Sequence, residues 1–249
     1  MAYSLFVIAC ALLIIVYYDS ETRLRSIFAR KTLQKRLAYI TWNSPRLFFA
    51  LTGNFLGFKF IFENTAKRPI PKQFLIISNH QSLLDIPVFF FFFSKYHVRF
   101  VSKKELGRWI PLISQVLRYQ EHCLVDRHAN QIQSMKRLDA FARRSAKMGW
   151  SPLIFPEGTR SRDGYVLPFH SAGVRRMLDL APMPVVTVAI DGGWKISDFA
   201  SLAHIRGAQY RVRILNVYDA PQNKKESAAL LETAREEISK QINEWNGRA

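Results

Sequence analysis

Short apolar runs alternate along this chain with segments long enough to form helices, and this alternation constrains the fold more than any other feature of the sequence. The runs are rich in β-branched and aromatic residues and occupy positions 74–77, 98–101, 123–125, 153–155 and 185–190. Runs this short and this apolar are typical of strands buried on both faces, which intervening helices connect into a largely parallel sheet. We therefore expect an α/β fold with a sheet flanked by helices.

The segments outside these strands show periodicities of their own. Apolar side chains recur at helical spacing at Ile132, Met135, Leu138 and Ala142, and Gly149 is placed to end that helix. Residues 231–245 predict a closing amphipathic helix. Residues 210–214 instead alternate apolar side chains with arginine, as a half-exposed strand does. These patterns indicate core packing rather than chemistry.

The first 18 residues carry no charged side chain, a length at the lower edge of what crosses a bilayer. No Lys or Arg precedes this run and no small-residue cleavage site follows it, so an anchor is favoured over a cleaved signal peptide. Six Lys and Arg side chains follow within residues 23–36, and by the positive-inside rule they would keep the rest of the chain cytoplasmic. A helix lying flat in the membrane interface is the alternative.

A second membrane-associating helix is expected at residues 37–62, which are rich in aromatic side chains and contain two cations. Pro45 should break this helix, and Gly53 and Gly57 should loosen it. We therefore divide the chain into membrane-anchoring helices at 1–65 and one larger domain at 66–249.

Charge and cysteine content narrow the classes of partner. The chain has 36 Lys and Arg against 19 Asp and Glu, a net charge of +17, which favours nucleic acid, anionic lipid or phosphorylated ligands. Its two cysteines support neither a disulfide framework nor a thiolate metal site.

The first segment with chemical potential is NHQSLLD, residues 79–85, which directly follows the first strand. With Ser82 as the N-cap of a helix, His80 would lie just before the helix and Asp85 in its first turn. One imidazole nitrogen could then meet the Asp85 carboxylate while the other faces substrate. Such a pair suits a general base, because the carboxylate fixes the tautomer and stabilises the imidazolium. A capped, structural histidine is the alternative.

The second segment is FPEGTRS, residues 155–161, at the end of a later strand. Gly158 permits a tight turn, Thr159 supplies a hydroxyl, and Arg160 offers a planar fork that suits a phosphate. Glu157 places a carboxylate at a strand end, where α/β sheets collect ligand contacts. An ordinary polar turn with a surface arginine is the alternative.

Together and in this order, the His-x4-Asp motif NHxSxxD and the block FPEGTRS resemble the glycerolipid acyltransferase family of the 1-acylglycerol-3-phosphate acyltransferase type. The resemblance covers roughly residues 75–190. It implies a mixed β-sheet flanked by helices, with N-terminal helices that hold the catalytic domain on the bilayer.

The resemblance also implies roles for single residues. His80 corresponds to the general base that acts on the acceptor hydroxyl, and Asp85 to its partner. The acceptor-binding block corresponds to Glu157, Gly158, Thr159 and Arg160. Arg127 corresponds to a further basic residue associated with the acceptor phosphate, while Lys103 and Lys104 are candidates for that phosphate or for the donor, or are simply solvated.

Three positions depart from the family pattern and leave the identity of the acceptor open. Ser114 stands where a Gly is common, His170 where a Lys is common, and Thr187 where a second Pro is common.

The activity implied is O-acyl transfer from an acyl thioester to the free hydroxyl of 1-acylglycerol-3-phosphate, which forms phosphatidic acid in phospholipid biosynthesis. The donor would be acyl-CoA or acyl carrier protein, with no cofactor and no metal. The expected location is a phospholipid membrane, with the catalytic domain on the cytoplasmic face.

Other readings of the sequence stay open. The acceptor could be another lysophospholipid or an amino-acid-derived lyso-lipid. A non-catalytic basic protein that binds membranes or nucleic acid is the alternative from a different class, and its main support is the net charge. Scattered basic residues and an apolar N-terminus argue against nucleic acid. The sequence has no recognised spacing of metal ligands, which argues against a metal hydrolase. It also has no G-x-S-x-G element, which argues against a serine hydrolase.

Overall fold

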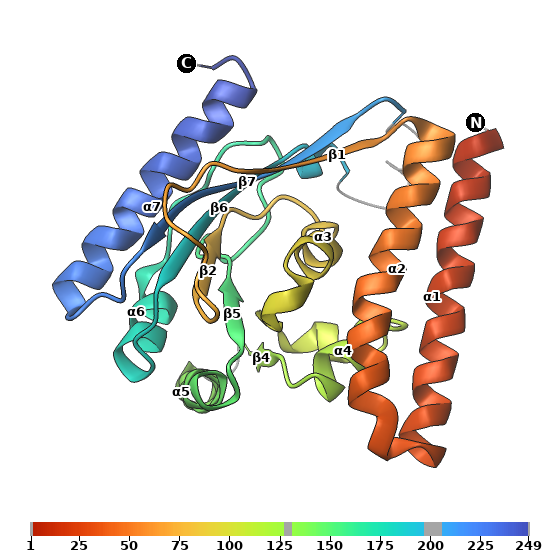
Figure 1. Cartoon of the computed structure of the whole chain (residues 1–249), viewed down its shortest axis with the longest axis horizontal. Helices are drawn as coiled ribbons and strands as arrows, with labels where there is room; N and C mark the ends of the chain where they lie inside the picture. Colours follow the sequence, from red (N-terminus) through yellow and green to blue (C-terminus); the bar gives the residue numbers. More distant parts are fainter. Residues whose placement is uncertain (1, 127–130, 197–205, 249) are drawn as a thin grey trace.

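The computed structural model describes residues 2–126, 131–196 and 206–248, and in these parts of the chain a seven-stranded sheet carries helices on both faces (Figure 1). The strands are β1 (Lys59–Asn64), β2 (Leu75–Ser78), β3 (Val98–Lys103), β4 (Cys123–Val125), β5 (Ser151–Ile154), β6 (Val185–Asp191) and β7 (Gln209–Tyr218). Their order across the sheet is β1-β7-β6-β2-β5-β3-β4. Neighbouring strands are parallel except for β6 and β7, so the prediction of a mixed sheet in an α/β fold is confirmed.

The central strand β2 shows why both faces of the sheet are covered. All four of its residues are buried. Ile76 belongs to the core on one face, whereas Leu75 and Ile77 belong to the core on the other, because successive strand side chains point to opposite faces. The first core includes α3 (Asp85–Phe92), and the second includes α5 (Gln131–Met148), α6 (Ser171–Leu180) and α7 (Lys224–Trp245).

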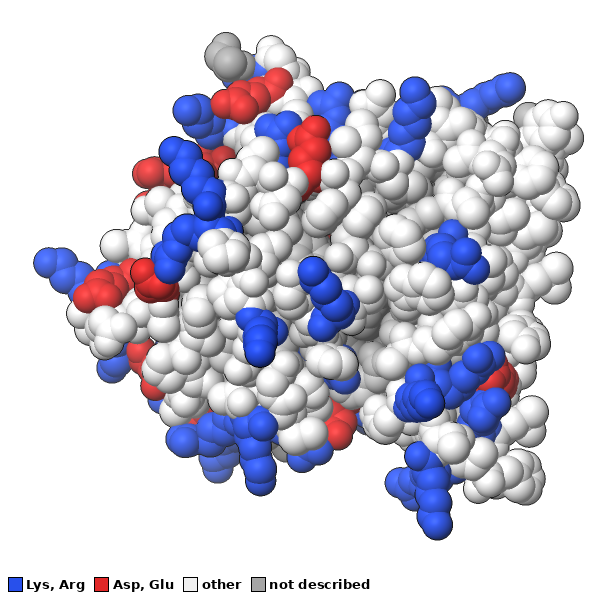
Figure 2. All heavy atoms as spheres, viewed as in Figure 1, with Lys and Arg blue, Asp and Glu red and all other residues white. Residues whose placement is uncertain are grey.

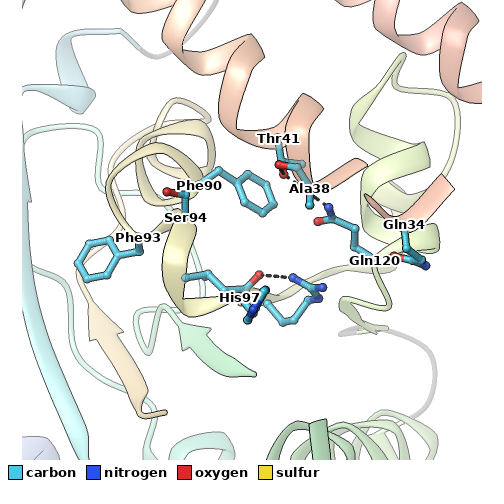
Figure 3. Close-up of a pocket in the computed structure, with 10 residues that line it drawn as sticks. Gln34, Ala38, Thr41, Phe90, Phe93, Ser94, His97 and Gln120 are labelled. Carbon is cyan, nitrogen blue, oxygen red and sulfur yellow. Dashed lines mark hydrogen bonds between the residues drawn. The ribbon is translucent and has the colours of Figure 1, made fainter. Parts of the chain in front are cut away.

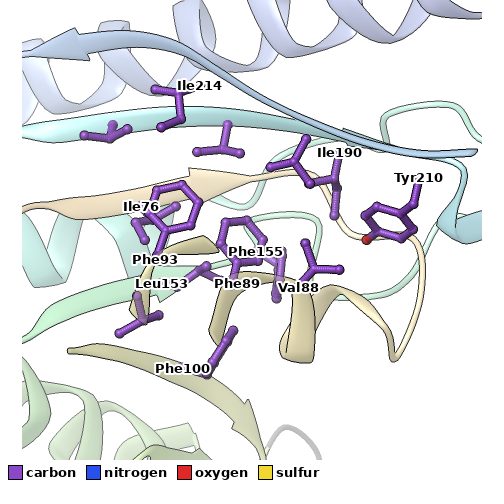
Figure 4. Close-up of a cluster of buried hydrophobic side chains, with 14 of the residues drawn as sticks. Ile76, Val88, Phe89, Phe93, Phe100, Leu153, Phe155, Ile190, Tyr210 and Ile214 are labelled. Carbon is purple, nitrogen blue, oxygen red and sulfur yellow. The ribbon is translucent and has the colours of Figure 1, made fainter. Parts of the chain in front are cut away.

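The first of these cores is rich in aromatic side chains (Figure 4). Phe89 of α3 and Phe93, the C-cap of that helix, are buried against the sheet. They lie on the same face of the helix because they are four residues apart. Phe91 is half-buried and packs edge-on against Phe49 of α2 (Leu33–Leu56), with ring centroids 5.3 Å apart. The run of phenylalanines therefore joins α3 both to the sheet and to the N-terminal helices.

The helices α1 (Ala2–Phe28) and α2 lie side by side, and α2 packs between α1 and α3 (Figure 1). Among the described residues, α1 is the one helix long and apolar enough to cross a membrane. Many apolar side chains along its outer side are exposed. Figure 2 shows that the surface over the N-terminal part of α1, at the right, is largely uncharged, whereas Lys and Arg gather toward its other end. These properties support membrane association.

The expectation of a second helix at 37–62 is wrong in two respects. Helix α2 is not broken at Pro45 but continues through it. A proline inside a helix costs about 3 kcal/mol, and we attribute the continuity to the packing of α2 against α1 and α3. The helix ends at Gly57, which adopts a left-handed φ of 63°, and Lys59–Asn64 then form β1, parallel to β7. The sheet thus begins before residue 65, where we had divided the chain.

The other periodic segments fold as expected. α5 ends just before Gly149, which has a φ of +67°, and β7 and α7 occupy the predicted regions. Leu138 and Ala142 of α5 are buried, but Ile132 and Met135 are exposed and not part of the core.

Candidate active site

The two motifs meet at the carboxyl edge of the sheet. Residues 79–85 follow β2, and residues 155–161 follow its parallel neighbour β5. The carboxyl ends of adjacent parallel strands lie at one edge, which is where α/β proteins usually bind ligands. The N–H of Ser161 donates to the carbonyl oxygen of His80 over 2.8 Å, so the two segments are bonded to each other.

The helix after β2 begins later than we expected. Ser82 is not its N-cap, because α3 starts at Asp85 and Ser82 lies in the preceding turn. The Ser82 hydroxyl donates to the carbonyl oxygen of Ile196 over 2.7 Å. Oδ2 of Asp85 accepts from the backbone N–H groups of Gln81 and Ser82 at 2.8 and 3.1 Å. Asp85 therefore holds the turn that carries His80.

His80 and Asp85 form the pair that the sequence predicts. Nδ1 of His80 lies 2.6 Å from Oδ2 of Asp85, and the imidazole stacks on the Phe155 ring with centroids 4.1 Å apart. Because an ionised carboxylate can only accept, Nδ1 carries the proton and the lone pair of Nε2 is free to take one. The His80 side chain is 18% exposed, so it is not sealed within the core.

Asp85 is fully buried and has a partner that sequence analysis missed. The hydroxyl of Tyr210, at the start of β7, donates to Oδ1 of Asp85. Burial and the neighbouring Asp85 carboxylate raise the pKa of Tyr210 well above its usual value, so the phenol stays protonated and remains a donor. The alternation in β7 identifies Tyr210 as an inward-facing residue, but it does not reveal which carboxylate the hydroxyl meets.

Glu157 binds the backbone of the other motif. Its Oε1 accepts from the N–H of His80 at 2.7 Å, and its Oε2 accepts from the N–H of Leu167 at 3.1 Å. The residue is 2% exposed. Burial raises the pKa of the Glu157 carboxyl to about 8, and the two amide donors oppose this shift. This position suits a group that fixes His80 rather than one that touches substrate.

The remaining residues of the FPEGTRS turn are more accessible. Gly158 has a left-handed φ of 69°, and its N–H donates to the carbonyl oxygen of Phe155 at 3.1 Å, which closes the turn. Thr159 is exposed and Arg160 is half-buried. Within the described parts of the chain, the Arg160 guanidinium has no hydrogen bond or ion pair, so it is available to an anion.

Two further basic candidates, Lys103 and Lys104, lie at the same edge of the sheet, where β3 ends. Lys103 is exposed, whereas Nζ of Lys104 lies 3.5 Å from Oδ2 of Asp126. Arg127 lies outside the described residues. The roles of these three cations in substrate binding stay predictions.

Two polar side chains next to His80 also escaped sequence analysis. The side-chain amide of Asn79 donates to the carbonyl oxygen of Ile190 in β6 at 2.8 Å and accepts from the N–H of Ile190 at 2.9 Å. Asn79 thus extends the pairing of β2 with β6 beyond the end of β2. Oε1 of Gln81 accepts from the N–H of Gly193 at 3.1 Å. A Cβ atom at Gly193 would lie 3.2 Å from Oδ1 of Asp85, so only glycine fits there without displacement. The glycine pair after β6 was the one sequence signal of this close approach.

A small cavity of about 60 Å³ lies away from these motifs (Figure 3). Its walls include Thr41 of α2, Phe90 of α3 and Arg99 at the start of β3. Because β3 is parallel to β5, its start lies at the amino edge of the sheet, opposite His80. In the described residues, no three His, Cys, Asp or Glu side chains come together as metal ligands.

Comparison with known proteins shows which family the chain belongs to. The model of a family described as Acyltransferase matches residues 59–191, which run from β1 to the end of β6 and include both motifs. The chain belongs to the acyltransferase family. It is 36% identical over 142 residues to a 1-acyl-sn-glycerol-3-phosphate acyltransferase of Limnanthes douglasii, covering 55% of this chain and 47% of that protein. A protein of the same description from Helicobacter pylori is 32% identical over 147 residues, covering 57% of this chain and 56% of that protein.

A solved structure shares the whole architecture. The crystal structure of the 1-acyl-sn-glycerophosphate (LPA) acyltransferase PlsC from Thermotoga maritima covers 100% of this chain and 96% of its own, with a TM-score of 0.72 and 23% identity. At this identity the likeness establishes the acyltransferase fold. The matches to curated relatives span about half of the length of those proteins, from 37% to 47% in the first three.

Proposed function

We propose that this protein is an O-acyltransferase in which His80 is the general base. The observation that carries the proposal is the bonding between the two motifs. His80 donates its N–H to Glu157 and receives the N–H of Ser161 on its carbonyl oxygen, while its imidazole meets Asp85. The imidazole and the Arg160 turn are thereby held at one edge of the sheet.

In the proposed reaction, Nε2 of His80 takes the proton of the acceptor hydroxyl while that oxygen attacks the thioester carbonyl carbon. The tetrahedral intermediate collapses as the carbon–sulfur bond breaks, and the proton passes from Nε2 to the departing thiolate. Asp85 stabilises the imidazolium between these two steps. No covalent enzyme intermediate, cofactor or metal takes part.

Backbone amides of the turn are candidates for stabilising the oxyanion. Among the described residues, the N–H groups of Thr159 and Arg160 have no hydrogen-bond partner, whereas that of Gly158 is already used. Free N–H groups beside a general base can bind a developing negative charge.

We propose 1-acylglycerol-3-phosphate as the acceptor and phosphatidic acid as the product. Two features support this choice: the names of the relatives, and the Arg160 guanidinium, which suits a phosphate. Arg127, Lys103 and Lys104 are further candidates for the phosphate or for the donor. The donor is an acyl thioester, either acyl-CoA or acyl carrier protein. Another lysophospholipid is the second candidate acceptor.

We further propose that the catalytic domain faces the cytoplasmic side of a phospholipid membrane. The uncharged part of α1 would contact lipid, and the cations that follow it would stay on the cytoplasmic side. Because α2 packs between α1 and α3, the catalytic domain stays close to the bilayer. A lyso-lipid can then reach His80 without leaving the membrane surface.

A panel of acceptors tests the proposal. Purified protein is given acyl-CoA or acyl carrier protein donors with 1-acylglycerol-3-phosphate, with lysophospholipids of larger head group, and with a monoacylglycerol that lacks phosphate. A lost charged hydrogen bond corresponds to roughly a 10- to 100-fold weaker interaction. We expect Arg160→Ala to raise KM by that factor for the phosphate acceptors alone, and Arg162→Ala, the exposed neighbour, to leave it unchanged. An unchanged KM in Arg160→Ala would contradict the phosphate role.

A further inference from the structure

Trp109, in the segment after β3, is almost completely exposed to solvent. Trp109 is 95% exposed, although tryptophan carries one of the largest apolar surfaces of any side chain. It also has a left-handed φ of 67°, which is rare for a bulky residue. It lies between η3 (Lys104–Gly107) and α4 (Ile113–Tyr119). Both the exposure and the backbone conformation therefore call for an explanation.

Specific contacts hold the Trp109 segment in this conformation. The Ser114 hydroxyl accepts from the N–H of Ile110 at 2.9 Å and donates to the carbonyl oxygen of Leu106 at 3.0 Å. On the other side, the N–H of Leu112 donates to Oδ1 of Asp19 in α1 at 2.7 Å. The loop is thus tied to itself and to the N-terminal helix, with the indole directed outward.

The attachment point on α1 locates Trp109 relative to the apolar surface of that helix. Residues 12, 16, 19 and 23 follow one another at helical spacing and lie along one side of α1. Leu12 and Val16 on this side are about half exposed. Asp19 is also the first charged side chain of the sequence, so it marks the end of the uncharged run. The Trp109 segment therefore docks where the exposed apolar surface of α1 meets charged residues.

We propose that Trp109 inserts into the interfacial layer of a phospholipid bilayer and serves as a second membrane contact, beside α1. The inference rests on the proposed membrane association. If α1 crosses the bilayer, its first charged residue, Asp19, lies at the membrane interface. If α1 instead lies flat on the bilayer, the edge of its exposed apolar face lies at the interface. Both orientations bring Trp109 to interfacial depth, which is the preferred location of tryptophan.

Positively charged side chains near Trp109 favour a lipid surface as its partner. Arg108 is exposed and, within the described residues, has no side-chain partner. Arg23 lies on the same side of α1 as the docking point, and its side chain is 58% exposed although it pairs with Asp19. Cations next to an aromatic side chain suit the phosphate layer of a membrane. The contact would orient the catalytic domain on the bilayer, because the segment leaves the sheet at the edge that carries His80.

Depth-dependent quenching of fluorescence tests this inference. The full chain is reconstituted in phosphatidylglycerol and phosphatidylcholine vesicles whose acyl chains are brominated either near the glycerol or near the methyl end. The chain has five tryptophans, so the signal of Trp109 is the difference between wild type and Trp109→Phe. Trp245→Phe is the matched control, because Trp245 lies on α7, on the other face of the sheet.

We expect the Trp109 difference signal to be quenched most strongly by bromine near the glycerol, and the Trp245 signal to be unaffected. Trp109→Ala should lower turnover about tenfold on a vesicle-embedded long-chain acceptor and leave turnover on a water-soluble short-chain acceptor unchanged. Met148→Ala, which removes an exposed apolar side chain at the end of α5, should affect neither.

A Trp109 signal that ignores brominated lipid but responds to an aqueous quencher would overturn the inference, as would equal losses on both acceptors. Wild-type protein that acylates neither acceptor would instead refute the proposed activity. The quenching result is independent of turnover, so the two failures can be told apart.

Discussion

Tyr210→Phe removes one hydroxyl from the candidate active site and leaves the ring in place. In the wild type, Oδ1 of Asp85 accepts from the Tyr210 hydroxyl and, at 3.1 Å, from the N–H of Ser82. A hydrogen bond to a charged group contributes about 1.5–3 kcal/mol, and we expect the variant to lose that much free energy of unfolding. The Asp85 carboxylate also loses one of the donors that fix its position, so it holds the imidazole of His80 less firmly. We expect kcat for acyl transfer to fall about tenfold, which corresponds to about 1.4 kcal/mol of transition-state stabilisation, while KM for the acceptor stays unchanged.

The assay measures kcat and KM for acyl transfer separately, together with chemical denaturation in detergent. Tyr18→Phe is the matched control, because its buried hydroxyl accepts from Nδ2 of Asn43 at 2.7 Å in the N-terminal helices. That variant should lose about 1 kcal/mol of stability and keep the wild-type kcat. If Tyr210→Phe loses stability but keeps the wild-type kcat, Tyr210 supports the fold alone, and the reasoning about Asp85 is refuted.

Two further predictions concern the buried surroundings of His80. Burial raises the pKa of Glu157 to about 8, so between its ordinary value of 4.5 and about 8 the folded protein holds a proton that the unfolded chain has released. The free energy of unfolding should therefore fall as pH rises through this window, by up to about 1.4 kcal/mol per unit relative to Glu157→Gln; equal pH slopes in denaturation of the two proteins would contradict this. Gly193→Ala would place a Cβ atom 3.0 Å from Cβ of Ser82 and 3.1 Å from the Tyr210 ring, and we expect a loss of about 1–3 kcal/mol in denaturation and reduced turnover. Gly53→Ala in α2, whose Cβ would meet nothing closer than 3.5 Å, should instead be neutral or stabilising.

The architecture could be predicted from the sequence to the extent that it depends on local apolar patterns. Each of the five apolar runs overlaps one strand of the sheet, because buried strands between helices carry that signature. Strand β1 was missed because its phenylalanines continue the apolar character of α2, and periodicity over so few residues cannot separate a buried helix from a strand. The left-handed turn at Gly57 is what divides them.

In the candidate site, contacts between residues close in the sequence could be predicted, whereas contacts between distant residues could not. His80 and Asp85 are five residues apart, so their pairing could be anticipated from the turn between them. Tyr210 reaches Asp85 only because β7 returns antiparallel to β6 and starts at the carboxyl edge of the sheet. The hydrogen bond from the His80 N–H to Glu157 forms because β2 and β5 are neighbouring strands, and no local pattern in the sequence reveals it. The role of Glu157 in acceptor binding stays a prediction.

The release of free thiol from an acyl thioester, measured with wild type and His80→Ala at equal amounts of folded protein, tests the central claim most directly. With 1-acylglycerol-3-phosphate present, wild type should release one thiol for each phosphatidic acid formed, and His80→Ala should be slower by two or more orders of magnitude. Retention of wild-type turnover by the folded His80→Ala protein would contradict the account.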